Sequence, residues 1–86
     1  MRVLIPNPLR SYTADAAAVT ASGATLDELT VDLERHFPGM RFRVIDEQGH
    51  IRPHIRFFVN GLQRGDLRVP LQDSDEVMIV CALSGG

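Results

Sequence analysis

The sequence predicts an α+β fold in two layers, with one helix packed across one face of a β-sheet. One apolar stripe with helical spacing runs through residues 25–37, and the segments before and after it are short runs suited to strands. The chain has 86 residues, which is enough for one domain with a modest core. A single helix covers only one face of the sheet, so we expect the other face to carry no helix.

The N-terminal part predicts two short strands, the second less clearly than the first. Residues 2–5, Arg-Val-Leu-Ile, favour a strand that ends at the Pro-Asn-Pro turn of residues 6–8. Residues 16–21 leave helix and strand open. Their alanines favour a helix, whereas Val19, Thr20 and the following Ser22-Gly23 suit a strand.

The predicted helix, residues 25–37, begins with a capping box. In this arrangement the hydroxyl of Thr25 and the carboxylate of Glu28 each satisfy a free backbone N–H at the helix start. Pro38-Gly39 ends the helix. The apolar stripe, which we expect to be core, consists of Leu26, Leu29, Leu33 and Phe37.

Short strands and turns follow the helix. Residues 42–44 alternate and predict a strand, residues 47–49 a turn, and Ile51 resumes the strand pattern. Residues 55–59 are β-branched and aromatic, and Asn60-Gly61 after them indicates a tight turn. A polar turn at residues 70–75 precedes residues 77–81, an apolar run that favours a central strand. The expected core is Val3, Ile5, Leu26, Leu29, Leu33, Phe37, Phe57, Val59, Val77 and Ile79.

Composition excludes several classes of function. A net charge of −2 gives no basic footprint for nucleic acid. No apolar run approaches the roughly 20 residues of a membrane span, and Pro6 and Pro8 interrupt any signal-peptide core, so we expect a cytoplasmic protein without a membrane partner. All nine basic residues are arginines, so no lysine is present to accept an isopeptide bond.

Metal and thiol chemistry are also disfavoured. Cys81 is the only cysteine, which rules out an internal disulfide and a cysteine-rich metal site. Its place in an apolar strand favours a small buried residue over a reactive thiol. His50 and His54 are close in sequence but lack an evident third ligand, so we expect no metal site.

Three stretches near the C-terminus carry a resemblance to a known family. They are residues 57–61, Phe-Phe-Val-Asn-Gly, residues 70–77, Pro-Leu-Gln-Asp-Ser-Asp-Glu-Val, and residues 82–86, Ala-Leu-Ser-Gly-Gly. With them the chain resembles the ThiS/MoaD family of ubiquitin-like sulfur carriers. Residues 21–26 and 51–54 are similar to the subgroup that supplies sulfur to amino-acid synthesis, cysteine synthesis above all.

The resemblance implies a β-grasp fold like that of ubiquitin, with the first and last strands parallel and adjacent. It would make residues 16–21 a strand. It also divides the chain into a β-grasp domain, residues 1–81, and a flexible C-terminal tail, residues 82–86. Two terminal glycines suit a tail that enters a narrow channel, because a Cβ would clash there.

The family chemistry implies that the protein is a co-substrate and not itself an enzyme. A ubiquitin-activating-enzyme-like adenylyltransferase uses ATP to adenylate the Gly86 carboxylate, and a sulfur donor then displaces AMP to leave a thiocarboxylate. A sulfur-accepting synthase consumes this sulfur, and a tail-trimming metalloprotease is a further candidate partner. The expected site is Gly86 and Gly85, with Leu83 and Ser84 in the tail, no catalytic side chain and no bound cofactor.

Alternation suggests how partners hold the domain. Phe58 lies between the inward residues Phe57 and Val59, so it faces away from the helix. If the last strand aligns with that of ubiquitin by its Gly-Gly end, Met78 and Val80 join Phe58 in an exposed docking patch. The alternative is that Phe58 packs under a loop.

Pathway and competing functions are left open by the sequence. The sulfur could go to cysteine or methionine, a thiocarboxylate metabolite, thiamine or molybdopterin. Two other functions are a ubiquitin-like modifier conjugated through Gly86 and a β-grasp interaction module with an idle tail. Modifiers usually carry arginine close before the glycines, whereas this tail has Ala82-Leu83-Ser84, which favours the carrier.

Overall fold

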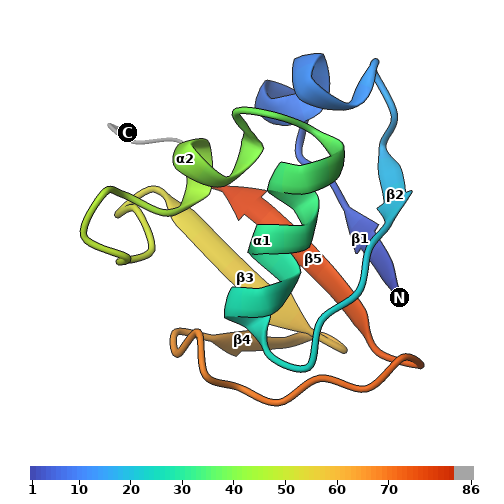
Figure 1. Ribbon diagram of the computed structural model, residues 1–86, viewed down its shortest axis with the longest axis vertical. Coiled ribbons are helices and arrows are strands. Elements are labelled where there is room, and N and C mark those ends of the chain that lie inside the picture. Colours follow the sequence, from blue (N-terminus) through green and yellow to red (C-terminus); the bar gives the residue numbers. More distant parts are fainter. Residues whose placement is uncertain (83–86) are drawn as a thin grey trace.

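The computed structural model describes residues 1–82, and its centre is one five-stranded mixed sheet (Figure 1). The strand order is β2-β1-β5-β3-β4. The strands are β1 (Arg2–Leu4), β2 (Ala18–Thr20), β3 (Ile55–Val59), β4 (Leu62–Arg64) and β5 (Glu76–Cys81). Strands β1 and β5 are parallel neighbours, and every other pair is antiparallel. The first and last strands therefore lie side by side at the middle of the sheet, as predicted.

Helix α1 (Leu26–His36) crosses one face of this sheet, which gives the predicted two layers (Figure 1). The short helix α2 (Met40–Val44) and the 3₁₀ helix η1 (Asn7–Thr13) lie near the end of the sheet to which β5 points (Figure 1). Within residues 1–82 no helix is long and apolar enough to cross a bilayer.

The start of α1 follows its sequence signals. Thr25 Oγ1 accepts a hydrogen bond from the Glu28 N–H at 3.2 Å, and Glu28 Oε1 accepts one from the Ala24 N–H at 3.1 Å. The carboxylate thus reaches one residue further back than in the usual capping box. The helix ends at His36, and Phe37 is only half-buried at its C-cap, with φ −134° and ψ 81°. Phe37 therefore packs against the edge of the core and is not fully buried as predicted, because the chain has already left the helix there.

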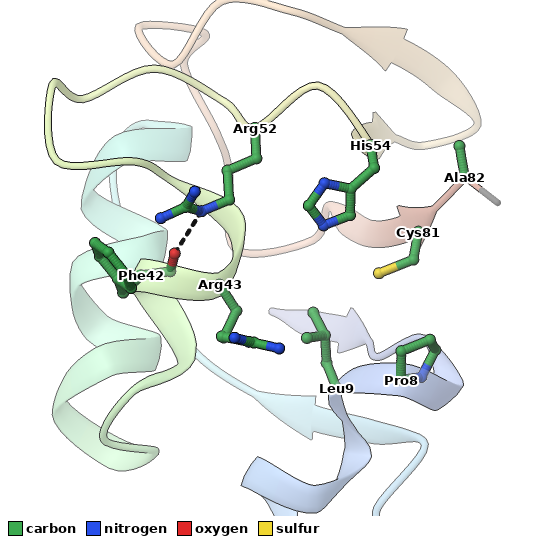
Figure 2. Close-up of a pocket in the computed structure, with 8 residues that line it drawn as sticks. All are labelled: Pro8, Leu9, Phe42, Arg43, Arg52, His54, Cys81 and Ala82. Carbon is green, nitrogen blue, oxygen red and sulfur yellow. Dashed lines mark hydrogen bonds between the residues drawn. The ribbon is translucent and has the colours of Figure 1, made fainter. Parts of the chain in front are cut away.

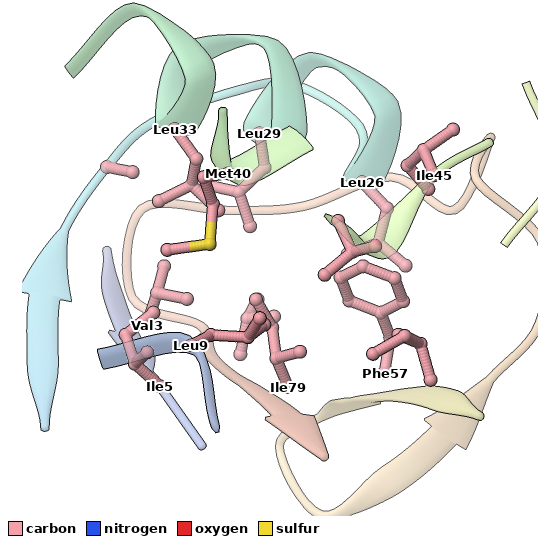
Figure 3. Packing of buried hydrophobic residues seen from close by; sticks show 14 of the residues in the cluster. Val3, Ile5, Leu9, Leu26, Leu29, Leu33, Met40, Ile45, Phe57 and Ile79 are labelled. Carbon is pink, nitrogen blue, oxygen red and sulfur yellow. The ribbon is translucent and has the colours of Figure 1, made fainter. Parts of the chain in front are cut away.

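The core lies between α1 and the sheet (Figure 3). Leu26, Leu29 and Leu33 are fully buried, and the inward residues of the central strands meet them from below. The other predicted core residues, Val3, Ile5, Phe57, Val59, Val77 and Ile79, are also buried. Ile55 of β3 is buried with them. Within residues 1–82 the core also contains six residues that the sequence did not indicate: Leu9, Ala21, Met40, Val44, Ile45 and Leu71.

Residues 42–44 are the clearest departure from prediction, since they belong to α2 and form no strand. Alternation over three residues is too short to separate strand from helix, and Met40 and Val44 are four apart, which puts both on one helix face. Gly39 begins the helix with φ 95°, a conformation that glycine adopts readily. The ambiguous residues 16–21 contain the strand β2, in which Ala18 pairs with Leu4.

Candidate docking face and tail anchor

Apolar side chains line up across the face of the sheet that α1 leaves open. Strand β3 alternates between buried and half-buried residues, with Phe58 on the open face. Phe58 pairs with Met78 of β5, and Met78 pairs in turn with Leu4 of β1. Val80 lies two pairs further along β5, opposite Arg56 and on the same face as Met78. Neighbouring strands thus bring Phe58, Met78 and Val80 together, with Leu4 beside them.

This row is accessible to different degrees. Met78 is 36% exposed, whereas Leu4, Phe58 and Val80 are half-buried. Leu4 was missed by the sequence reasoning, although its place between the inward Val3 and Ile5 would have put it on this face. We call these four residues the open-face row.

The turns that carry the family resemblance hold one another in place at the start of β5. Asn60 accepts a hydrogen bond from the Glu76 N–H at 2.9 Å and donates one to Asp75 at 2.9 Å. The second carboxylate oxygen of Asp75 accepts from the Gln72 N–H at 2.8 Å. This backbone bond, with the one from Asn60, lowers the pKa of Asp75. The β3–β4 hairpin and the turn before β5 are therefore a single hydrogen-bonded unit.

The end of β5 anchors the segment that precedes the terminal glycines. Cys81 pairs with Ile55, and the Ala82 N–H donates to the His54 carbonyl at 2.7 Å. Leu83, Ser84, Gly85 and Gly86 lie outside the described residues. The strand that leads to them is central in the sheet, with β1 on one side and β3 on the other.

A pocket of about 410 Å³ opens beside this anchor (Figure 2). Pro8, Leu9, Cys81 and Ala82 form its apolar side, and Arg43, Arg52 and His54 its basic side. Burial raises the pKa of the Cys81 thiol, and the nearby Arg43 charge opposes that rise. The thiol is half-buried at the pocket wall. A raised pKa favours the protonated thiol, which is the poorer nucleophile.

No other reactive cluster emerges from the described part of the chain. Residues 1–82 contain no group of three or more His, Cys, Asp or Glu that could hold a metal ion. His50 and His54 both lie in the loop between α2 and β3, and of the two only His54 lines the pocket near the end of β5.

Comparison with known proteins decides the family. The model of the ThiS family matches residues 3–86. The chain belongs to the ThiS family. It is a homologue of the sulfur carrier protein CysO of Mycobacterium tuberculosis, with 34% identity over 89 residues, covering 98% of this chain and 96% of that relative.

Solved structures of family members agree with the fold. The crystal structure of Mycobacterium tuberculosis CysO matches with a TM-score of 0.89 at 32% identity, over 95% of this chain and 98% of that one. CysO from Amycolatopsis orientalis, in a crystal structure of its complex with BexX, matches with a TM-score of 0.90 at 32% identity, over 99% and 98% of the two chains. The small archaeal modifier protein 1 of Haloferax volcanii, at 24% identity and a TM-score of 0.80 over 100% of this chain and 98% of that one, shares the fold.

Proposed function

We propose that this CysO homologue carries sulfur as a thiocarboxylate on the C-terminal Gly86 and supplies it to cysteine biosynthesis. The observation that carries the proposal is the similarity to a sulfur carrier over nearly the whole chain, together with a terminal Gly-Gly that follows the central strand β5 after three intervening residues. In this proposal partner enzymes bind the domain formed by residues 1–81 and modify the C-terminus of the tail, residues 82–86.

The chemistry belongs to partner enzymes. A carboxylate is a poor electrophile, so an adenylyltransferase first joins Gly86 to AMP and releases pyrophosphate from ATP. Sulfide then attacks the acyl carbon, and AMP leaves. The product is a nucleophilic thiocarboxylate that a synthase uses, and the carrier returns with a carboxylate. The protein acts as a co-substrate in the cytoplasm and needs no bound cofactor.

The open-face row is the surface that we assign to the adenylyltransferase. Its apolar side chains come from the three neighbouring strands β1, β5 and β3. The chain continues from β5 into the tail, so the row and the tail share one strand. Met78 adds a flexible side chain that can adapt to the partner surface. In this proposal the apolar contact supplies affinity for the adenylyltransferase, and the Gly86 carboxylate is the group that reacts.

Reconstitution tests the proposal. The purified chain is incubated with ATP, sulfide and the adenylyltransferase encoded nearest to its gene, and its intact mass is measured. We expect the mass to rise by the difference between sulfur and oxygen. A chain lacking Gly86 is the control and should keep its mass. A Gly86-deleted chain that gains sulfur as fast as the full chain would contradict the proposal.

A further inference from the structure

The basic side of the pocket beside the tail anchor is built from three segments that are distant in sequence. Arg43 comes from α2, Arg52 and His54 from the loop before β3, and the pocket wall includes Ala82 directly after β5 (Figure 2). A partner enzyme that binds the tail in a channel approaches the chain at Ala82. The rim of that channel then lies opposite the side chains of this pocket.

Arg52 is fixed in position. Its Nε donates to the Phe42 carbonyl at 2.7 Å, and its guanidinium lies 4.5 Å from the centre of the Phe42 ring (Figure 2). Its backbone N–H also donates to the Val44 carbonyl at 2.9 Å. These contacts hold the charge of Arg52 against α2 and reduce the side-chain entropy that a new ion pair would otherwise remove.

The charges at this pocket are not neutralised within the described chain. Four other arginines, Arg2, Arg35, Arg41 and Arg68, each have a carboxylate oxygen within 4.0 Å. Within residues 1–82 the other five arginines, Arg10, Arg43, Arg52, Arg56 and Arg64, have no such partner, and of these only Arg43 and Arg52 line this pocket. Asp46, which feels the Arg52 charge, has a lowered pKa mainly because it accepts the His50 N–H.

The two ends of β5 carry opposite charge. Asp73, Asp75 and Glu76 lie at its start, where only Glu76 has an arginine, Arg2, within 4.0 Å. Arg43 and Arg52 lie near its end. A partner with complementary charges would meet the chain in one orientation only, with the tail toward the acidic side of its surface.

We propose that this pocket receives an acidic side chain of the adenylyltransferase, from the rim of the channel that admits the tail. The proposal rests on the function assigned above. A carboxylate on a short aliphatic stem fits the pocket because Leu9, Pro8 and Cys81 contact the stem while Arg43 binds the oxygens. Arg52, held against Phe42, adds a second positive charge at the pocket edge. The pocket thereby sets the orientation of docking and adds to the selectivity for one adenylyltransferase over others.

Steady-state kinetics with the adenylyltransferase test this role. The variant Arg43→Gln/Arg52→Gln should raise the KM for the carrier by about five- to tenfold and leave kcat within about twofold, as expected for the loss of two ion pairs near a surface. The matched control Arg35→Gln/Arg68→Gln removes the same charge elsewhere and should leave KM unchanged. Wild-type KM should rise with salt, and that of the first variant should rise much less.

The single variant Arg43→Gln separates the loss of charge from a loss of stability, because the Arg43 side chain donates no hydrogen bond within residues 1–82. It should raise KM about two- to fourfold and unfold at the wild-type urea midpoint to within experimental error. The double variant should unfold at a lower urea concentration, because it also loses the contacts of Arg52 with Phe42. An unchanged KM in both pocket variants, with the wild type thiocarboxylated normally, would overturn the inference while the proposed function stands. Failure of the wild type to be thiocarboxylated would overturn both.

A free anion is the competing occupant, and inorganic phosphate is its probe. We expect no saturable change in the amide NMR signals of residues 43 and 52 with millimolar phosphate. Saturable phosphate binding combined with an unchanged KM in the variants would assign the pocket to a free anion and overturn docking.

Discussion

The two faces of the central strands differ in what their side chains do, although the residues alternate along the same backbone. On the inner face, Phe57 and Val77 are fully buried under α1. On the outer face their neighbours Phe58 and Met78 remain accessible, with Met78 36% exposed. Both faces are apolar, so composition alone does not separate them. Because side chains alternate every residue along a strand, the same strand can bury one face in the core and leave the other face accessible for the docking role that we propose.

Replacing adjacent phenylalanines compares the faces most sharply. Phe57→Ala should lower the free energy of unfolding by about 3–5 kcal/mol, because it leaves a cavity beneath α1. Phe58→Ala should cost less than about 2 kcal/mol, since the side chain is only half-buried. Urea unfolding of the two variants measures the difference. Equal losses would mean that both faces are core.

Helix α1 offers the same comparison from the opposite side of the core. Leu33→Ala should cost about 2–5 kcal/mol, since Leu33 is fully buried. Val31, on the same helix, is 42% exposed, and Val31→Ala should change stability by less than about 1 kcal/mol. Thermal unfolding followed by circular dichroism checks both. A larger loss of stability in Val31→Ala would mean that Val31 is buried in solution and would contradict the prediction that this side of α1 is exposed.

A charge on the open-face row should separate docking from folding. Phe58→Asp should weaken binding to the adenylyltransferase by more than about 1.4 kcal/mol, a tenfold loss of affinity, because it puts a carboxylate into an apolar contact. The domain should stay folded, although less stable than the wild type. Calorimetry gives the affinity and circular dichroism the fold. Full affinity in a folded Phe58→Asp chain would move the docking surface elsewhere.

The smallest expected effect concerns the turn that starts β5. The pKa of Asp75 is lowered from its ordinary value of 3.8 by hydrogen bonds from Gln72 and Asn60. A folded-state pKa below the unfolded one means that Asp75 stabilises the fold above pH 3.8, and that this contribution disappears as pH falls through the folded pKa. The stability gap between wild type and Asp75→Asn should therefore shrink below pH 3.8. A gap that does not vary with pH would contradict this.

The sequence predicted the regions where several local signals agree. Thr25 and Glu28 mark the start of α1, the leucine spacing marks its buried side, and β3 shows its alternation within five residues. Asn60-Gly61 predicted the β3–β4 hairpin, where both residues adopt positive φ. Each of these signals acts within a few residues, so no tertiary information was needed.

Segments stabilised by distant contacts were predicted poorly. Pro6 and Pro8 predict a simple turn where the structure has the 3₁₀ helix η1, because the burial of Leu9 depends on the whole core. Residues 42–44 predict a strand where the structure has α2, because three alternating residues fit either element and the burial of Met40 and Val44 decides between them. The basic pocket was missed as a result, since Arg43 reaches it from α2 and Ala82 from the far end of the chain.

The most direct test of the account locates the sulfur atom. After reconstitution with isotopically heavy sulfide, trypsin should release residues 69–86 as one peptide, because Arg68 is the last basic residue and the chain has no lysine. This peptide contains both Cys81 and Gly86, and fragmentation by tandem mass spectrometry distinguishes them. We predict heavy sulfur in place of one carboxylate oxygen of Gly86, with Cys81 unmodified. Heavy sulfur on Cys81, with an unaltered Gly86 carboxylate, would contradict the account.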